Sequence, residues 1–313
     1  MTSYLRTTLP ILFITIFIIC SLPAISQPSE YVINKKNGRI ILAYKAFEDY
    51  LDSEKIWDNY VETVLSPIPE MEYLHKRRLY WGAIDSLKFP KEVEQFKKED
   101  FQYFLKPGID KYFVNLYDSI ISVANQIIEL SEYDSANLCL FLPYNSCFML
   151  PEEGENTIFI SLRIEQKMIP LIIAHEYGHC LHFQLRPEEK LTLQREVINE
   201  GMAVYLSQLF LKNSSIREII PFMPESTVDW CMENEKLVGD SIYNDLKMTG
   251  DALYAKYISD GSFASPPEGF PAKTAYFTGY RIIEKCVAKN IPVTELCSMS
   301  SEEVIELSGY FDR

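Results

Sequence analysis

The sequence predicts an α+β fold that is predominantly helical, with a small sheet beside one central helix. Apolar residues such as Phe113, Leu116 and Ile120 recur at three- and four-residue steps, a spacing typical of amphipathic helices. Two apolar runs, at 138–143 and 157–162, have the length and composition of strands. The 313 residues are 47% apolar, which is enough to bury the core of one large or two modest domains.

Residues 1–26 are predicted to be a cleaved secretory signal. Arg6 supplies a positive charge, Ile11–Cys20 is an apolar run, and small residues precede Gln27. The run is short for a membrane span, so no stable membrane insertion is expected after cleavage, and an uncleaved N-terminal anchor is the lesser alternative. Lipidation is not expected, because Ile19 stands where a lipoprotein signal has a small residue before its cysteine. We therefore expect an exported protein, either periplasmic or extracellular.

Two regions are expected after the signal. A helical N-terminal region at 27–137 begins with a loose polar leader over 27–37, and its expected role is packing. The region 138–313 contains both predicted strands and is expected to form the second domain. Within it, one helix is predicted over 164–185 and a second over 191–212.

Charge and cysteine content narrow the classes of partner. A net charge of −14 argues against nucleic acids and anionic membranes. Six cysteines remain beyond the signal, and Cys139 with Cys147 and Cys286 with Cys297 are candidate disulfide pairs in an exported chain. No CxxC spacing indicates a structural zinc site. The oligomeric state is left open.

The most informative stretch is Ile169–His182, which contains an HExxH motif formed by His175, Glu176 and His179. Residues four apart lie on the same face of a helix, so the two imidazoles can bind one Zn²⁺. Glu176 lies about 100° round the helix from His175, beside the metal, where it can act as a base toward a metal-bound water. The neighbouring residues are uncharged, as a helix buried beside a cleft requires.

Zinc needs a third protein ligand, with the fourth position left for water. His182 shares the helical face, but the rise of roughly 1.5 Å per residue puts it about 10.5 Å along the axis from His175, too far for one ion. Glu200 lies on the next predicted helix, and the twenty residues between it and His179 allow a turn and an antiparallel return. We therefore predict one Zn²⁺ per chain, bound by His175, His179 and Glu200, with His182 lining the cleft or packed beneath it.

These motifs carry a resemblance to a known family. HEYGH at 175–179 followed by NEGMA at 199–203 resembles the gluzincin branch of zinc metallopeptidases, in which two histidines and a downstream glutamate hold the zinc. Together with FTGYRI at 277–282, these motifs most closely resemble those of a domain-of-unknown-function family of predicted Zn-dependent proteases. The resemblance covers roughly residues 138–290 and implies a zincin-like catalytic domain.

The resemblance implies a zinc peptidase that acts on a peptide or protein substrate. Glu176 would be the general base toward the zinc-bound water that attacks the peptide carbonyl. The oxyanion needs a second donor, for which Tyr280 is predicted and Tyr276 is the alternative, and Arg281 is a candidate to hold a substrate carboxylate. The family often has an acid four residues after its glutamate ligand, where this chain has Val204, so the group supporting a histidine ligand must come from elsewhere, with Asn199 or another acid as the candidates.

Three further hypotheses compete with an endopeptidase. An aminopeptidase is less favoured, because Gly154-Glu155-Asn156 lacks the Met and the spacing of the amine-binding Gly-x-Met-Glu-Asn strand. The strand at 157–162 is expected to present an edge to which an extended peptide can add. A catalytically silent zincin-fold binding protein is the second hypothesis, although a purely structural zinc would not need Glu176. The third is another amide hydrolase that uses the same zinc site.

Overall fold

The computed structural model describes residues 29–102, 106–128, 136–144, 147–152, 155–212, 215–221 and 223–312. Within them the fold is mostly helical with one small mixed sheet, which confirms the predicted α+β class. The predicted signal, including Cys20, lies outside the described residues. No helix in the described ranges has the length and apolar character needed to cross a membrane.

The helices and strands alternate little along the chain. The strands are β1 (Val32–Lys35), β2 (Gly38–Ile41), β3 (Ala136–Phe141), β4 (Cys147–Glu152) and β5 (Glu155–Ser161). The helices before β3 are α1 (Ala43–Asp52), α2 (Trp57–Tyr60), α3 (Pro69–Tyr80), α4 (Phe89–Glu94) and α5 (Ile109–Ile128). The helices after β5 are α6 (Ile169–Leu185), α7 (Leu193–Leu211), α8 (Ile216–Ile219), α9 (Glu225–Glu233), α10 (Glu235–Asp245), α11 (Asp251–Leu253), α12 (Thr274–Ala288), α13 (Val293–Cys297) and α14 (Ser301–Ser308).

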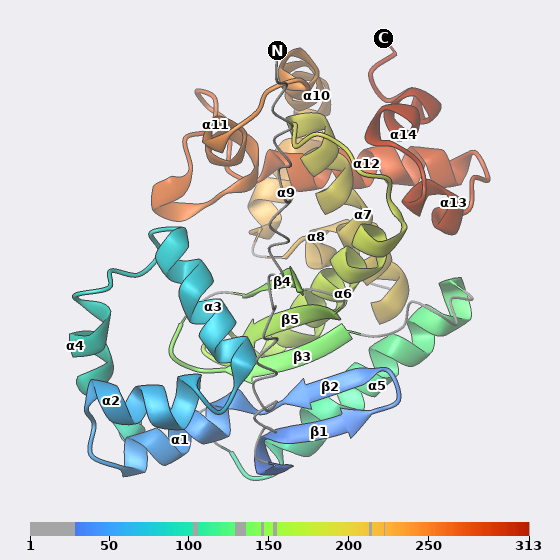
Figure 1. Cartoon of the computed structure of the whole chain (residues 1–313). Coiled ribbons are helices and arrows are strands. Elements are labelled where there is room, and N and C mark those ends of the chain that lie inside the picture. The colour runs from blue at the N-terminus through green and yellow to red at the C-terminus, as the bar shows by residue number, and fades with distance from the viewer. Residues whose placement is uncertain are drawn as a thin grey trace, which may run out of the picture.

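The sheet has the strand order β1-β2-β3-β5-β4, and its centre is buried. The pairs β2–β3 and β3–β5 are parallel, whereas β1–β2 and β4–β5 are antiparallel. Every residue of β3 is buried, as expected of a strand covered on both faces. Figure 1 shows α6, α7 and α12 following one another away from the sheet, with the hairpin of β1 and β2 at its opposite margin.

The edge strand beside α6 is β4, and this corrects the prediction of an exposed edge at 157–162. That segment belongs to β5, which lies between β3 and β4. The sequence did not predict β4, because Pro151 and the acidic residues after it are typical of a turn. Proline lacks the N–H that a central strand must donate, but an edge strand tolerates it.

The N-terminal hairpin was also misread as a loose leader over 27–37. Val32–Lys35 instead pairs with β2, and β2 pairs in parallel with β3. Gly38 has a φ of 118°, and a Cβ there would lie 2.1 Å from the carbonyl oxygen of Ala136. Only glycine allows the hairpin to approach β3 this closely. The sheet therefore takes strands from both regions that the sequence predicted.

The two predicted disulfides are absent from the described structure, because all six of its cysteines are thiols. Cys139 in β3 and Cys147 in β4 lie opposite Phe159 and Ile160 of β5. An intervening strand separates such residues by about 10 Å, beyond the reach of a disulfide. Cys286 instead donates its thiol to the carbonyl of Val304, at 3.4 Å.

Candidate metal centre

Two helices bring three candidate ligands together. His175 and His179 lie one turn apart on α6, with their Nε2 atoms 3.1 Å apart. Glu200 enters from α7, and its Oε2 lies 3.3 Å from Nε2 of His175 and 3.4 Å from Nε2 of His179. All three side chains are buried. The structure therefore assembles the three residues that the sequence predicted as a ligand set.

The triangle of donor atoms has the size that zinc requires. Tetrahedral zinc with metal–ligand bonds of about 2.0–2.1 Å separates neighbouring donor atoms by about 3.3 Å. The three observed separations are 3.1, 3.3 and 3.4 Å. The donor set therefore fits a divalent metal ion without rearrangement.

Close helix packing holds this triangle. Gly201 follows Glu200 directly, and a Cβ at Gly201 would lie 2.2 Å from the backbone carbon of Gly279 in α12. A Cβ at Gly279 would lie 2.0 Å from the carbonyl oxygen of Val197. At Gly178 of α6, a Cβ would come within 3.1 Å of the α7 backbone. Glycine at these positions lets α6, α7 and α12 approach almost backbone to backbone.

The buried carboxylate and imidazoles perturb one another strongly. Burial lowers the pKa of His175 to about 4. Burial also opposes the charged form of His179, but the carboxylates of Glu200 and Glu176 outweigh it and raise the pKa of His179 to about 9. Burial would raise the pKa of Glu200, yet the two histidines hold it well below its usual range.

Glu176 lies beside this triangle. Burial is the largest influence on its carboxyl group and raises the pKa of Glu176 to about 7. The backbone N–H of Met149 in β4 donates to the carboxylate and opposes that rise. Glu176 therefore connects the helix of the candidate ligands to the edge strand of the sheet.

Tyr276 lies at the site, whereas Tyr280 does not. The Tyr276 ring stacks on His175 with the ring centroids 6.0 Å apart, and burial followed by the charge of Glu200 raises the pKa of Tyr276 well above its ordinary value. Tyr280, the predicted oxyanion donor, lies one turn further along α12. Its hydroxyl donates to Gln208 at 3.0 Å, remote from the pocket.

Arg281 and His182 also lie away from the triangle. Arg281 was a candidate to hold a substrate carboxylate, but its guanidinium pairs with Glu235 at 3.2 Å and with Glu284. His182 is buried beneath the site, and burial lowers its pKa to about 3. Within the described ranges, Nδ1 of His175, His179 and His182 has no hydrogen-bond partner, whereas the side chain of Asn199 is hydrogen-bonded to His182. Among the described residues, no carboxylate therefore supports Nδ1 of either candidate ligand.

A pocket of about 260 Å³ opens onto the triangle. Phe148 and Met149 of β4 form one wall, and Phe183, Arg186 and Asn199 form another. The sequence singled out only Asn199 among these residues, as a candidate to support a histidine ligand. The β4 residues were missed because their strand was not predicted. Arg186 could have been found from the sequence, because it directly follows α6, the helix that bears the HExxH motif.

The comparisons with known proteins identify the family. The family model described as gliding motility protein GldB matches residues 92–311, which is more than half of the chain and includes α6, α7 and α12. The chain belongs to the GldB family. No curated protein matches it in a sequence search. GldB proteins form a family of gliding motility lipoproteins, which indicates a cell-envelope location and a protein-interacting role.

Membership of the GldB family overturns the peptidase interpretation. The gluzincin resemblance, the hydrolase activity with Glu176 as general base and the peptide substrate were wrong, because the family is a motility component and not a metallopeptidase family. Two histidines and a glutamate on antiparallel helices describe how a metal can be held, and that geometry does not by itself specify a reaction. The lipoprotein family also speaks against the expectation that the chain is not lipidated.

Proposed function

We propose that this protein is a catalytically silent zinc-binding component of gliding motility at the cell envelope, whose metal centre docks another protein. One Zn²⁺ is bound by His175, His179 and Glu200. The observation that carries the proposal is the triangle of donor atoms, with edges of 3.1–3.4 Å that match tetrahedral zinc.

The chemistry of the donors favours zinc over the hard cations. Imidazole nitrogen suits zinc and its neighbours among the transition metals, whereas calcium and magnesium take oxygen ligands. Burying two imidazoles and a carboxylate without a metal leaves partly compensated charge in the interior, which is costly. A bound divalent cation removes that cost, so metal binding is expected to stabilise the fold as well.

The shape of the pocket favours docking. A volume of about 260 Å³ lies below the roughly 300–1,000 Å³ typical of small-molecule sites, and it suits one side chain or one chain end of a partner. The edge strand β4 lies at the pocket and offers backbone groups to an extended partner segment. The family's place in motility supports a role in holding another protein.

Metal content tests the proposal most directly. The purified full chain is expected to contain about one zinc per chain when its metal content is measured by inductively coupled plasma mass spectrometry. Glu200→Ala and His175→Ala remove a donor atom each, so both variants are expected to lose most of the zinc. His182→Ala is the matched control, because His182 lies outside the donor triangle and the variant is expected to keep most of the metal.

A peptide library separates docking from turnover. The zinc-loaded chain is expected to leave a diverse library uncleaved over long incubation. Cleavage that is abolished by a chelator would contradict the silent role, whereas zinc retained in Glu200→Ala but lost in His182→Ala would contradict the ligand set.

A further inference from the structure

Arg186 places a positive charge at the pocket, and its side-chain hydrogen-bond partner there is the neutral amide of Asn199. Its Nη1 donates to the amide oxygen of Asn199 at 3.2 Å, and its guanidinium lies 5.1 Å from the centroid of the Phe183 ring. In the described part of the chain, no Asp or Glu oxygen lies within 4.0 Å of this guanidinium. A half-buried arginine with a single neutral acceptor has unused donors, and here they belong to a residue that lines the pocket.

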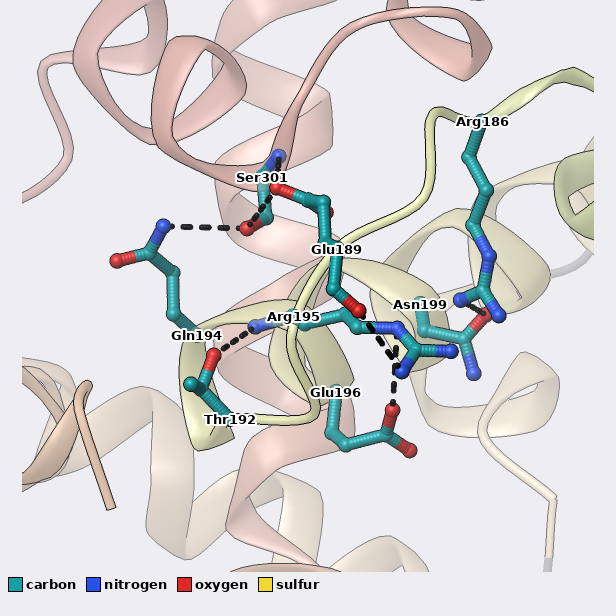
Figure 2. A network of polar contacts seen from close by, with 8 residues as sticks. All are labelled: Arg186, Glu189, Thr192, Gln194, Arg195, Glu196, Asn199 and Ser301. Carbon is teal, nitrogen blue, oxygen red and sulfur yellow. Dashed lines mark hydrogen bonds and ion pairs between the residues drawn. The ribbon is translucent and has the colours of Figure 1, made fainter. Parts of the chain in front are cut away.

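The nearby carboxylates are engaged elsewhere, as Figure 2 shows. Glu189 accepts from the backbone N–H of Ser301 at 2.9 Å and from its hydroxyl at 3.0 Å. Glu196 faces Arg195, with 3.9 Å between the carboxylate oxygen and Nε. These contacts hold the segment between α6 and α7 against α14, and they leave Asn199 as the partner of Arg186.

Among the groups that line the pocket, positive charges would outnumber carboxylates when a metal is bound, while Glu189 and Glu196 act on Arg186 from outside the lining. Zinc contributes two positive charges and Arg186 one, against the two carboxylates of Glu176 and Glu200. Lys273, which also acts electrostatically on Glu176, is paired with Asp260 at 3.0 Å. A single anion in the pocket would balance this charge, and unbalanced charge is costly beside buried groups such as His175, His179 and Glu200.

We propose that the pocket binds a carboxylate group of the docked partner, with one carboxylate oxygen at the open metal position and the other held by Arg186. This inference rests on the proposed zinc site. The guanidinium of arginine donates charge-assisted hydrogen bonds to a carboxylate oxygen, which leaves the second oxygen to bind the metal. The carboxylate belongs to an acidic side chain or to the C-terminal end of a partner chain, and both sources share the chemistry that the pocket recognises.

Cobalt substitution provides the test. The full chain is loaded with Co²⁺, its cobalt content is measured, and the visible spectrum is followed during titration with four probes. Acetyl-Ala-Glu amide and acetyl-Ala-Gln amide compare side chains, while acetyl-Ala-Ala acid and acetyl-Ala-Ala amide compare chain ends. Each carboxylate probe that fits is expected to shift the cobalt spectrum and to bind roughly tenfold or more tightly than its amide counterpart.

Substitution of Arg186 measures the contribution of this side chain to carboxylate binding. Arg186→Gln is expected to lower carboxylate affinity roughly tenfold while the cobalt content stays at one, and Arg186→Lys is expected to be intermediate. Arg217→Gln on the surface is the matched control and is expected to bind as the unaltered chain does. Stoichiometric cobalt with equal affinity for acids and amides would overturn the carboxylate proposal alone. Failure to bind cobalt or zinc would overturn the metal site and this inference with it.

Discussion

At the residue scale, the sequence predicted which side chains form the donor triangle but not all the residues that surround it. The four-residue spacing of His175 and His179 and the antiparallel return to Glu200 follow from helix geometry, and the structure brings the three together. Tyr276 and Tyr280 are also four residues apart, so periodicity alone could not say which one faces Glu200. The contact between Gly201 and Gly279 decides it, and tertiary packing of that kind leaves no signature in helical spacing.

His75 shows how a residue's neighbours in sequence can mislead. Three basic residues follow it, which indicates a solvated position, yet its ring packs on Trp57 and Phe89 and its Nδ1 lies 3.1 Å from the Tyr144 hydroxyl. Burial, followed by the charge of Arg78, lowers the pKa of His75 in the folded state. The unfolded chain therefore binds more protons below about pH 6.5, and the stability of the fold falls as the pH drops through that value.

His75→Gln is expected to remove the part of the acid-induced loss of stability that comes from His75. The free energy of unfolding in urea should fall less between pH 7.5 and pH 5 in the variant than in the unaltered chain. Lys76→Gln, one residue away on the surface, is the control and should fall as the unaltered chain does. Equal slopes for His75→Gln and the unaltered chain would show that His75 is not protonated differently in the two states.

At the element scale, long helices were predicted better than short strands. The structure ends α6 at Leu185 and begins α7 at Leu193, within a few residues of the predicted bounds. β4 was missed because a six-residue strand with a proline offers little periodic signal, and its pairing with β5 is decided by tertiary context. The pocket residues on β4 were missed together with the strand, so the sequence predicted the donor triangle more completely than the residues around it.

The glycine contacts between helices predict an ordered set of stability losses. Alanine in place of a mid-helix glycine gains about 1 kcal/mol from helix propensity, but overpacking costs about 3 kcal/mol where backbone atoms block the Cβ. Gly201→Ala and Gly279→Ala would place the Cβ 2.0–2.2 Å from backbone atoms, so both are expected to destabilise the fold by about 2 kcal/mol and to weaken zinc binding. Gly178→Ala, with its nearest contact at 3.1 Å, is the graded comparison and should cost less.

Denaturant unfolding and zinc titration of the three variants check this order. If Gly178→Ala were the most harmful, or if Gly201→Ala left both stability and zinc affinity intact, the α7–α12 contact would not be what holds Glu200 in place.

At the scale of the whole molecule, the metal motif and the family membership answer different questions. The sequence led from a metal-holding geometry to a peptidase, although binding a metal and turning over a substrate need different surroundings. The predicted oxyanion donor Tyr280 is bonded to Gln208, and Arg281 is bonded to Glu235. Two of the residues expected to complete a catalytic site, Tyr280 and Arg281, therefore serve as structural contacts, whereas Tyr276, the alternative donor, stacks on His175.

Membership of a lipoprotein family also predicts how the whole chain is held at the cell envelope. Cys20, which ends the N-terminal apolar run, is the cysteine placed for acylation, even though Ile19 precedes it. Cells expressing the unaltered chain are expected to incorporate an alkyne-labelled palmitate into it, and Cys20→Ser should lose the label. Cys147→Ser, which removes a thiol of β4 inside the fold, is the control and should keep the label. Label that persists in Cys20→Ser, or its absence from the unaltered chain, would show that the protein reaches the envelope without acylation of this cysteine.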